Sequence, residues 1–94
     1  MREYELVVIF SPEMEEEALN SSLEKLGGWI DAKGGTVTTQ EQWGRKKLSY
    51  PIKRFREGIF VLTQYQGGPQ LNRELEGNLK FAEEVLRYLL VKKE

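Results

Sequence analysis

The chain contains no cysteine and no histidine among its 94 residues, and Asp31 is its single aspartate. Without cysteine there is neither a disulfide nor a thiolate nucleophile, and without histidine the usual general base at neutral pH is missing. Zinc sites built from these two residue types are excluded with them. Magnesium or calcium can still bind carboxylates, but the sequence has no aspartate-rich loop to hold either ion. We therefore expect no metal site and no cofactor.

Long apolar runs are also missing, since no stretch approaches the roughly 20 residues that a membrane-spanning helix needs. The first five residues are mostly charged and pass straight into a short apolar stretch without a small-residue cleavage site, which does not fit a signal peptide. We expect a cytoplasmic protein. The length predicts a single domain over residues 1–94, because domains usually have about 100–150 residues.

Apolar periodicity predicts four strands and two helices. The first helix is expected to begin at Ser11-Pro12, with serine as the N-cap and proline in the first turn, and to end at Gly34-Gly35. Its apolar stripe consists of Leu19, Leu23, Leu26 and Ile30, and that of the second helix, which Gly67-Gly68-Pro69 opens, consists of Leu71, Leu75 and Leu79. The strands are expected at 3–10, 36–50 with a bend near Gly44, 59–65 and 85–91, and a charged connection at 52–58.

This order, βαββαβ, limits the arrangement of the strands. Right-handed crossovers place the first and third strands in the middle and the second and fourth at the edges, where Pro51 does not interrupt a central ladder. The sequence therefore predicts an α+β fold, a ferredoxin-like sandwich with a four-stranded antiparallel sheet and both helices on one face.

The central strands are apolar on both faces, although two helices can cover only one. In the first strand Leu6, Val8 and Phe10 alternate with Val7 and Ile9. An uncovered apolar face usually marks an interaction surface. We assign a protein-partner surface to Val7, Ile9, Ile59, Val61 and Tyr50. Two other interpretations remain open: side chains of the long second-strand hairpin fold over this face, or the domain forms a homodimer there.

Residues 45–56 contain six cations and no acidic residue, in a chain whose net charge is −1. Two aromatic residues, Tyr50 and Phe55, lie within this segment, and Trp43 precedes it. Lysine and arginine neutralise phosphates and aromatic rings stack on unpaired bases, so the segment predicts RNA binding. The plainer interpretation is a solvated hairpin. The candidate RNA-binding residues are Arg45, Lys46, Lys47, Lys53, Arg54 and Arg56, with Arg2 and Arg87 near strand ends as further candidates.

No catalytic constellation is visible. Acylphosphatases share this strand order, but they need a glycine-rich phosphate loop with an arginine after the first strand. Here that strand is followed by a serine, a proline and several glutamates, which repel phosphate. We expect no enzyme activity, and the alternative to RNA binding is a ferredoxin-like homodimerisation or ligand-sensing module.

Four segments together resemble the family of the sixth protein of the bacterial small ribosomal subunit. The most specific is a glycine followed by basic residues and then Leu-x-Tyr-Pro-Ile, found here at residues 44–53. The others are Met1-Arg2-x-Tyr4-Glu5, Glu57-Gly58-Ile59-Phe60 and Val85-Leu86-Arg87-Tyr88.

This resemblance implies a structural constituent of the small ribosomal subunit with a ferredoxin-like fold. It further implies that the protein pairs with the eighteenth small-subunit protein, and that the pair binds the central domain of 16S ribosomal RNA during assembly. A small-molecule substrate and a membrane are not expected among its partners. Gly27-Gly28 and Trp29 in the first helix depart from what the family leads us to expect.

Overall fold

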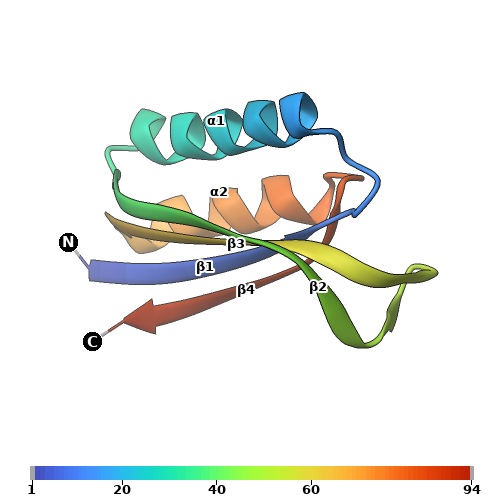
Figure 1. Ribbon diagram of the computed structural model, residues 1–94. Coiled ribbons are helices and arrows are strands. Elements are labelled where there is room, and N and C mark those ends of the chain that lie inside the picture. Colours follow the sequence, from blue (N-terminus) through green and yellow to red (C-terminus); the bar gives the residue numbers. More distant parts are fainter. Residues whose placement is uncertain (1, 94) are drawn as a thin grey trace.

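Two helices lie across one face of a four-stranded sheet whose other face is open (Figure 1). The computed structural model describes residues 2–93. The strands are antiparallel and follow the order β2-β3-β1-β4, which confirms the predicted ferredoxin-like sandwich. The elements are β1 (Arg2–Phe10), α1 (Glu16–Ala32), β2 (Thr36–Ile52), β3 (Phe55–Gly67), α2 (Pro69–Lys80) and β4 (Val85–Lys93).

The core lies between the helices and the sheet. Both predicted helix stripes are buried in it, and β1 contributes alternate residues, among them Leu6 and Val8, which are fully buried. Burying a leucine or valine side chain contributes roughly 1.5–3 kcal/mol relative to leaving it in water, so these residues fix the helix layer on this face. Across residues 2–93, no helix combines the length and apolar character that crossing a membrane requires.

The first helix begins later than predicted, at Glu16 instead of Ser11-Pro12. The Ser11 N–H donates to the Glu84 carbonyl at 2.8 Å, which ties the residue after β1 to the residue before β4. The Ser11 hydroxyl accepts from the Glu13 N–H at 3.2 Å and its carbonyl from the Met14 N–H at 3.3 Å. Ser11 therefore closes a turn that lifts the chain from the sheet to the helix layer, and α1 starts only after it.

The end of α1 agrees with the prediction. Gly34 has a φ of +80°, a left-handed conformation that glycine adopts without steric strain. The Gly35 N–H then donates to the Ile30 carbonyl at 2.9 Å, which satisfies a carbonyl of the last helical turn.

The prediction placed Ile59 and Val61 on the wrong face of the sheet. Phe10 lies opposite Ile59 and Val8 opposite Val61, and opposed residues of antiparallel strands project to the same side. Ile59 and Val61 therefore belong to the core beneath the helices. The open face instead carries Phe60 and Leu62 of β3 beside Ile9 and Val7 of β1.

The connection between β2 and β3 is shorter than the predicted 52–58 segment. Ile52 pairs with Phe55, so only Lys53 and Arg54 form the turn. Their φ angles are +51° and +79°, the geometry of a two-residue hairpin turn whose twist matches that of the flanking strands. Glycine and asparagine usually occupy such positions, which explains why the charged sequence did not reveal the turn.

Candidate nucleic-acid interface

The end of β2 near the hairpin turn leaves the regular ladder and curls beneath the open face of the sheet (Figure 1). Between the pairs Lys47–Glu57 and Ile52–Phe55, β2 advances by five residues and β3 by two. The extra residues of β2 form a wide bulge at 48–51, and they include Pro51, which has no N–H to donate to a ladder. The bulge carries Tyr50 toward β4.

The Arg87 guanidinium donates a hydrogen bond to the Tyr50 hydroxyl and joins the bulge to β4. Beneath the bulge, Ile9 and Phe60 line a hollow of about 360 Å³. Of the two interpretations left open for this face, folding-over by the hairpin is confirmed for the end of the sheet near the turn. Tyr50 remains 56% exposed, so its ring is held in place but not buried.

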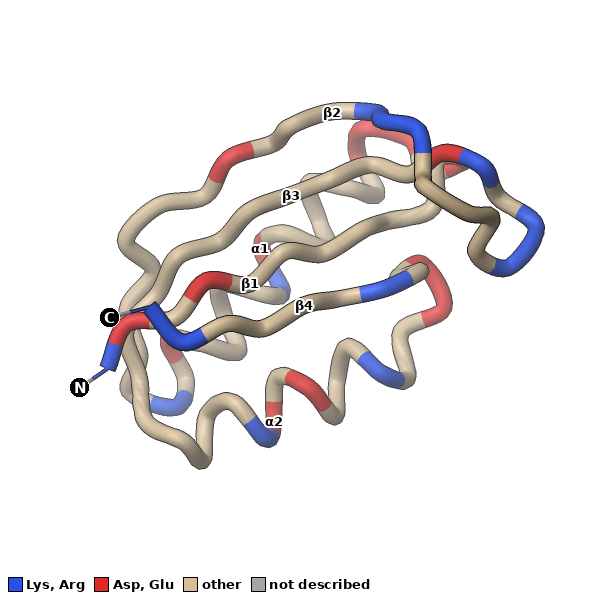
Figure 2. The backbone as a smooth tube through the Cα atoms, turned by 90° about the horizontal axis from the view of Figure 1, so that it is seen from below, with Lys and Arg blue, Asp and Glu red and all other residues tan. Residues whose placement is uncertain are grey.

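Most of the predicted RNA-binding cations gather at this hairpin end, where Figure 2 shows them on β2, on the turn, on the start of β3 and on β4. Arg2 does not join them. It pairs with Gly67 at the other end of β1, whereas Arg87 pairs with Ile9, and seven residues of strand separate the two levels by about 23 Å. The sheet therefore has two basic ends, and Arg2 lies at the smaller one with Lys92 and Lys93.

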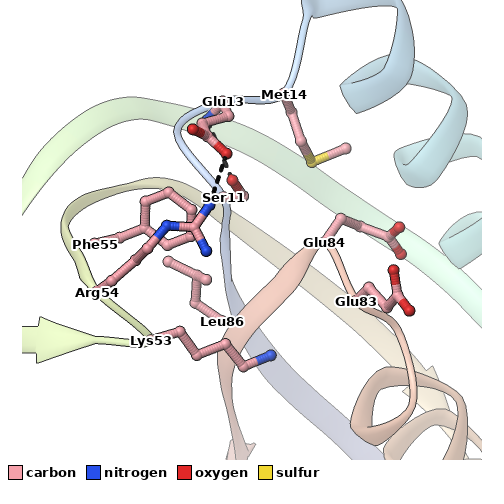
Figure 3. Close-up of a pocket in the computed structure, with 9 residues that line it drawn as sticks. All are labelled: Ser11, Glu13, Met14, Lys53, Arg54, Phe55, Glu83, Glu84 and Leu86. Carbon is pink, nitrogen blue, oxygen red and sulfur yellow. Dashed lines mark hydrogen bonds and ion pairs between the residues drawn. The ribbon is translucent and has the colours of Figure 1, made fainter.

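Three of the hairpin cations contact the β1–α1 connection or the start of β4. The Arg45 guanidinium donates to the Pro12 carbonyl at 2.9 Å, and the Lys53 ammonium donates to the Val85 carbonyl at 3.4 Å. The Arg54 guanidinium lies 3.5 Å from the Glu13 carboxylate and 4.7 Å from the centre of the Phe55 ring (Figure 3). These contacts hold the hairpin against the β1–α1 connection and the start of β4.

The side of the turn that faces these connections is unsuited to phosphate. A hollow of about 480 Å³ separates the turn from them, and Figure 3 shows Glu13, Glu83 and Glu84 around it together with Lys53 and Arg54. Three carboxylates face two cations that already have partners, so the local charge is not positive. Phosphate is better accommodated by the cations elsewhere on the hairpin.

Lys47 and Arg56 line another hollow beside the β2 bulge, and Lys46 precedes Lys47 on β2. The Lys46 ammonium lies 5.2 Å from the centre of the Trp43 ring, a cation–π distance. Within residues 2–93 neither Lys47 nor Arg56 forms an ion pair or a side-chain hydrogen bond. Both side chains are exposed and able to neutralise phosphates.

The remaining part of the open face carries exposed apolar residues next to a free sheet edge. Leu89 and Val91 of β4 are 56% and 47% exposed, and they lie opposite Val7 and Glu5 of β1. We did not assign Leu89 and Val91 to the partner surface from the sequence. Their alternation along the last strand could have indicated this exposed surface, because that strand was expected at an edge of the sheet.

Nothing in the described part of the chain points to catalysis. No group of three or more acidic side chains within residues 2–93 could hold a metal ion. Burial raises the pKa of the Tyr65 phenol, and Tyr4 and Glu76 raise it further. Its hydroxyl donates to the Asn72 side-chain oxygen at 2.6 Å, so it is a structural group of the core.

A ferredoxin-like sheet whose cations concentrate on one exposed hairpin is typical of a small nucleic-acid-binding protein. A family model described as Ribosomal protein S6 matches residues 3–92, and the chain belongs to this family. It is therefore a structural protein of the small ribosomal subunit, not an enzyme, and the cytoplasmic ribosome is its location.

Full-length relatives and a solved structure agree with this assignment. The small ribosomal subunit protein bS6 of Moorella thermoacetica is 40% identical over 94 residues, covering 100% of this chain and 96% of the relative. That of Clostridium novyi is 39% identical and covers 100% and 99%. The crystal structure of 30S ribosomal protein S6 from Thermotoga maritima superposes with a TM-score of 0.92 at 27% identity, covering 98% of this chain and 87% of that chain.

Proposed function

We propose that this protein binds the central domain of 16S ribosomal RNA together with the eighteenth small-subunit protein during assembly of the subunit. The observation that carries the RNA half of the proposal is the exposed pair Lys47 and Arg56, which has no partner among the described residues. Lys46 and Arg87 extend the positive surface on either side. Arg45, Lys53 and Arg54 are engaged within the protein and support the hairpin that presents these cations.

The protein half of the proposal depends on the apolar part of the open face. Leu89, Val91 and Val7 form a strip there beside the free edge of β4. An apolar strip next to unpaired strand hydrogen-bonding groups suits a partner that packs on the face and can also extend the sheet. Ile59 and Val61 are excluded from this surface because they lie in the core.

The test is a titration of the protein against a central-domain ribosomal RNA fragment, with and without the eighteenth protein, at several salt concentrations. Tight binding that weakens with salt and needs the partner supports both halves. Replacing Lys46, Lys47 and Arg56 by alanine should lower the log-salt slope by roughly 0.7–0.9 for each phosphate that is no longer neutralised. A variant with Lys25, Arg73 and Lys80 replaced by alanine removes the same charge from the helix layer and should keep the slope.

Two outcomes contradict the proposal. An unchanged salt slope in the Lys46, Lys47 and Arg56 variant removes the hairpin from the RNA interface. A stable homodimer in sedimentation, combined with no RNA binding with or without the partner, favours the homodimerisation module instead. In that case the Leu89 and Val91 strip becomes a self-association surface.

A further inference from the structure

We propose that the β2 bulge forms a binding site for a single unpaired nucleotide, with a preference for bases that carry an exocyclic amine. This inference rests on the proposed RNA-binding function and assigns a ligand to one part of that surface. The site is a hollow of about 480 Å³ between the β2 bulge and the start of β3, within the range of roughly 300–1,000 Å³ that small-molecule sites occupy. Its lining consists of Lys47, Leu48, Ser49, Tyr50, Pro51, Arg56 and Glu57.

The bulge itself creates the hollow. Since β2 contributes three more residues than β3 between Lys47 and Ile52, the two strands separate there and cannot close over the space between them. A regular hairpin of the same length would have filled this position with cross-strand contacts.

The Tyr50 ring is a stacking surface that is fixed in advance. It borders two hollows, one on the sheet side with Ile9 and Phe60 and the present one beside Arg56 and Glu57. The Arg87 guanidinium holds its hydroxyl, which limits rotation of the side chain. An exposed aromatic ring whose orientation is already set loses little entropy when a base stacks on it.

The charges around the ring are arranged for a nucleotide and not for a free anion. Lys47 and Arg56 supply positive charge for the phosphate. Glu57, which lies opposite Lys47 across the ladder, supplies a carboxylate that repels phosphate and only accepts hydrogen bonds. A nucleotide satisfies both if its phosphate lies against the cations and its base edge faces Glu57.

Glu57 also provides the basis for base selection. Cytosine, adenine and guanine carry an exocyclic amine that donates to a carboxylate, whereas the edge donor of uracil is its N3–H, which lies between two carbonyl oxygens that repel the carboxylate. The Ser49 hydroxyl can donate or accept and does not discriminate. We therefore expect cytidine to be bound at least about 5-fold more tightly than uridine, because uridine lacks the amine that donates this charged hydrogen bond.

The experiment is an NMR titration of the isotope-labelled full chain with oligocytidylate and oligouridylate of equal length, with inorganic phosphate as a third ligand. Saturable shifts confined to residues 47–51 and 56–57, at lower concentration for oligocytidylate, support the site. Replacing Glu57 by Gln should abolish the difference between the two oligonucleotides. Replacing Tyr50 by Ala should lower the affinity by about 10-fold, as the removal of one stacking platform predicts.

Controls separate this site from a general charge effect and from misfolding. Phe81 is 82% exposed beyond α2, so Phe81→Ala removes an exposed aromatic elsewhere and should leave the titration unchanged. Tyr50→Phe keeps the ring but removes the hydroxyl that Arg87 holds, so it should lose less affinity than Tyr50→Ala. Inorganic phosphate that reproduces the oligonucleotide shifts at equal affinity, or the absence of saturable shifts at 47–57, overturns the proposal.

The same variants distinguish failure of this site from failure of the proposed function. If Tyr50→Ala leaves binding of the ribosomal RNA fragment unchanged while the Lys46, Lys47 and Arg56 variant weakens it, the nucleotide site is wrong and the RNA-binding function stands. If the fragment is not bound under any condition, the proposed function fails, whereas the oligonucleotide titration still tests the hollow on its own.

Discussion

The Arg54 guanidinium lies 3.5 Å from the Glu13 carboxylate and thereby ties the hairpin turn to the β1–α1 connection. Both side chains are mostly exposed, so the pair contributes at most about 1 kcal/mol to stability. Its larger effect is on charge, because Glu13 neutralises a cation at the turn of the basic hairpin.

Replacing Glu13 by Gln should therefore strengthen binding to the ribosomal RNA fragment, by about 2- to 5-fold at low salt, and leave stability almost unchanged. A titration of the fragment at several salt concentrations measures this effect. Glu24→Gln, which removes one exposed carboxylate from the middle of α1, is the matched control and should have a smaller effect. Equal gains in both variants would mean that only net charge matters.

The turn residues Lys53 and Arg54 both have positive φ, and neither is a residue type that favours this conformation. We expect Lys53→Asn combined with Arg54→Gly to raise the free energy of unfolding by about 1 kcal/mol, even though the variant lacks two surface interactions. Urea denaturation measures the change. A decrease in stability would show that the interactions with Glu13 and the Val85 carbonyl outweigh the backbone strain.

The sequence predicted the fold well because the apolar spacing of its helices and the β-branched strands agree with one topology. It could not predict which face Val61 occupies, since alternation within one strand gives no register against its neighbour, and only the pairing with Val8 decides this. It also missed the partners of Ser11, because a serine before a proline suits a helix cap and a turn equally well. At the candidate interface the six clustered cations were predicted, but their division into engaged and free groups depends on contacts to Pro12, Glu13 and Val85.

Gly58 lies where β3 passes closest to Ile9. A Cβ atom at this position would overlap the Ile9 side chain and lie 3.3 Å from the Phe10 carbonyl oxygen. Gly58→Ala should therefore destabilise the protein by about 1–3 kcal/mol in chemical denaturation. Gly77→Ala is the matched control, because that position is in α2 with nothing within 4 Å, and it should stabilise the protein by about 0.5–1 kcal/mol.

The buried phenol of Tyr65 should make the free energy of unfolding decrease at alkaline pH. Its burial, together with Tyr4 and Glu76, raises the pKa of its phenol above the usual 10.0. The unfolded chain loses this proton near pH 10 while the folded chain retains it, so stability is unaffected below about pH 10 and falls above it. Tyr65→Phe should be about 1 kcal/mol less stable at neutral pH, where it lacks the hydrogen bond to Asn72, and should show a smaller alkaline loss.

Urea denaturation at a series of pH values measures the effect of Tyr65. The Tyr88→Phe variant retains Tyr65 and should retain the alkaline loss. If the wild type and Tyr65→Phe lose stability in parallel above pH 10, the lysines or other tyrosines cause the loss instead.

The apolar strip on β4 separates partner binding from RNA binding. Leu89 is 56% exposed, so Leu89→Asp should change the free energy of unfolding by less than about 1 kcal/mol, yet it places a charge where a packed partner would have to bury it. We expect association with the eighteenth protein to weaken by at least about 10-fold in sedimentation, because an unpaired buried charge costs more than about 1.4 kcal/mol. Glu83→Asp, which changes a carboxylate on the α2–β4 connection, is a control that should bind normally. Normal association of the Leu89→Asp variant would move the partner off this face and leave the free edge of β4 or the helix layer as its site.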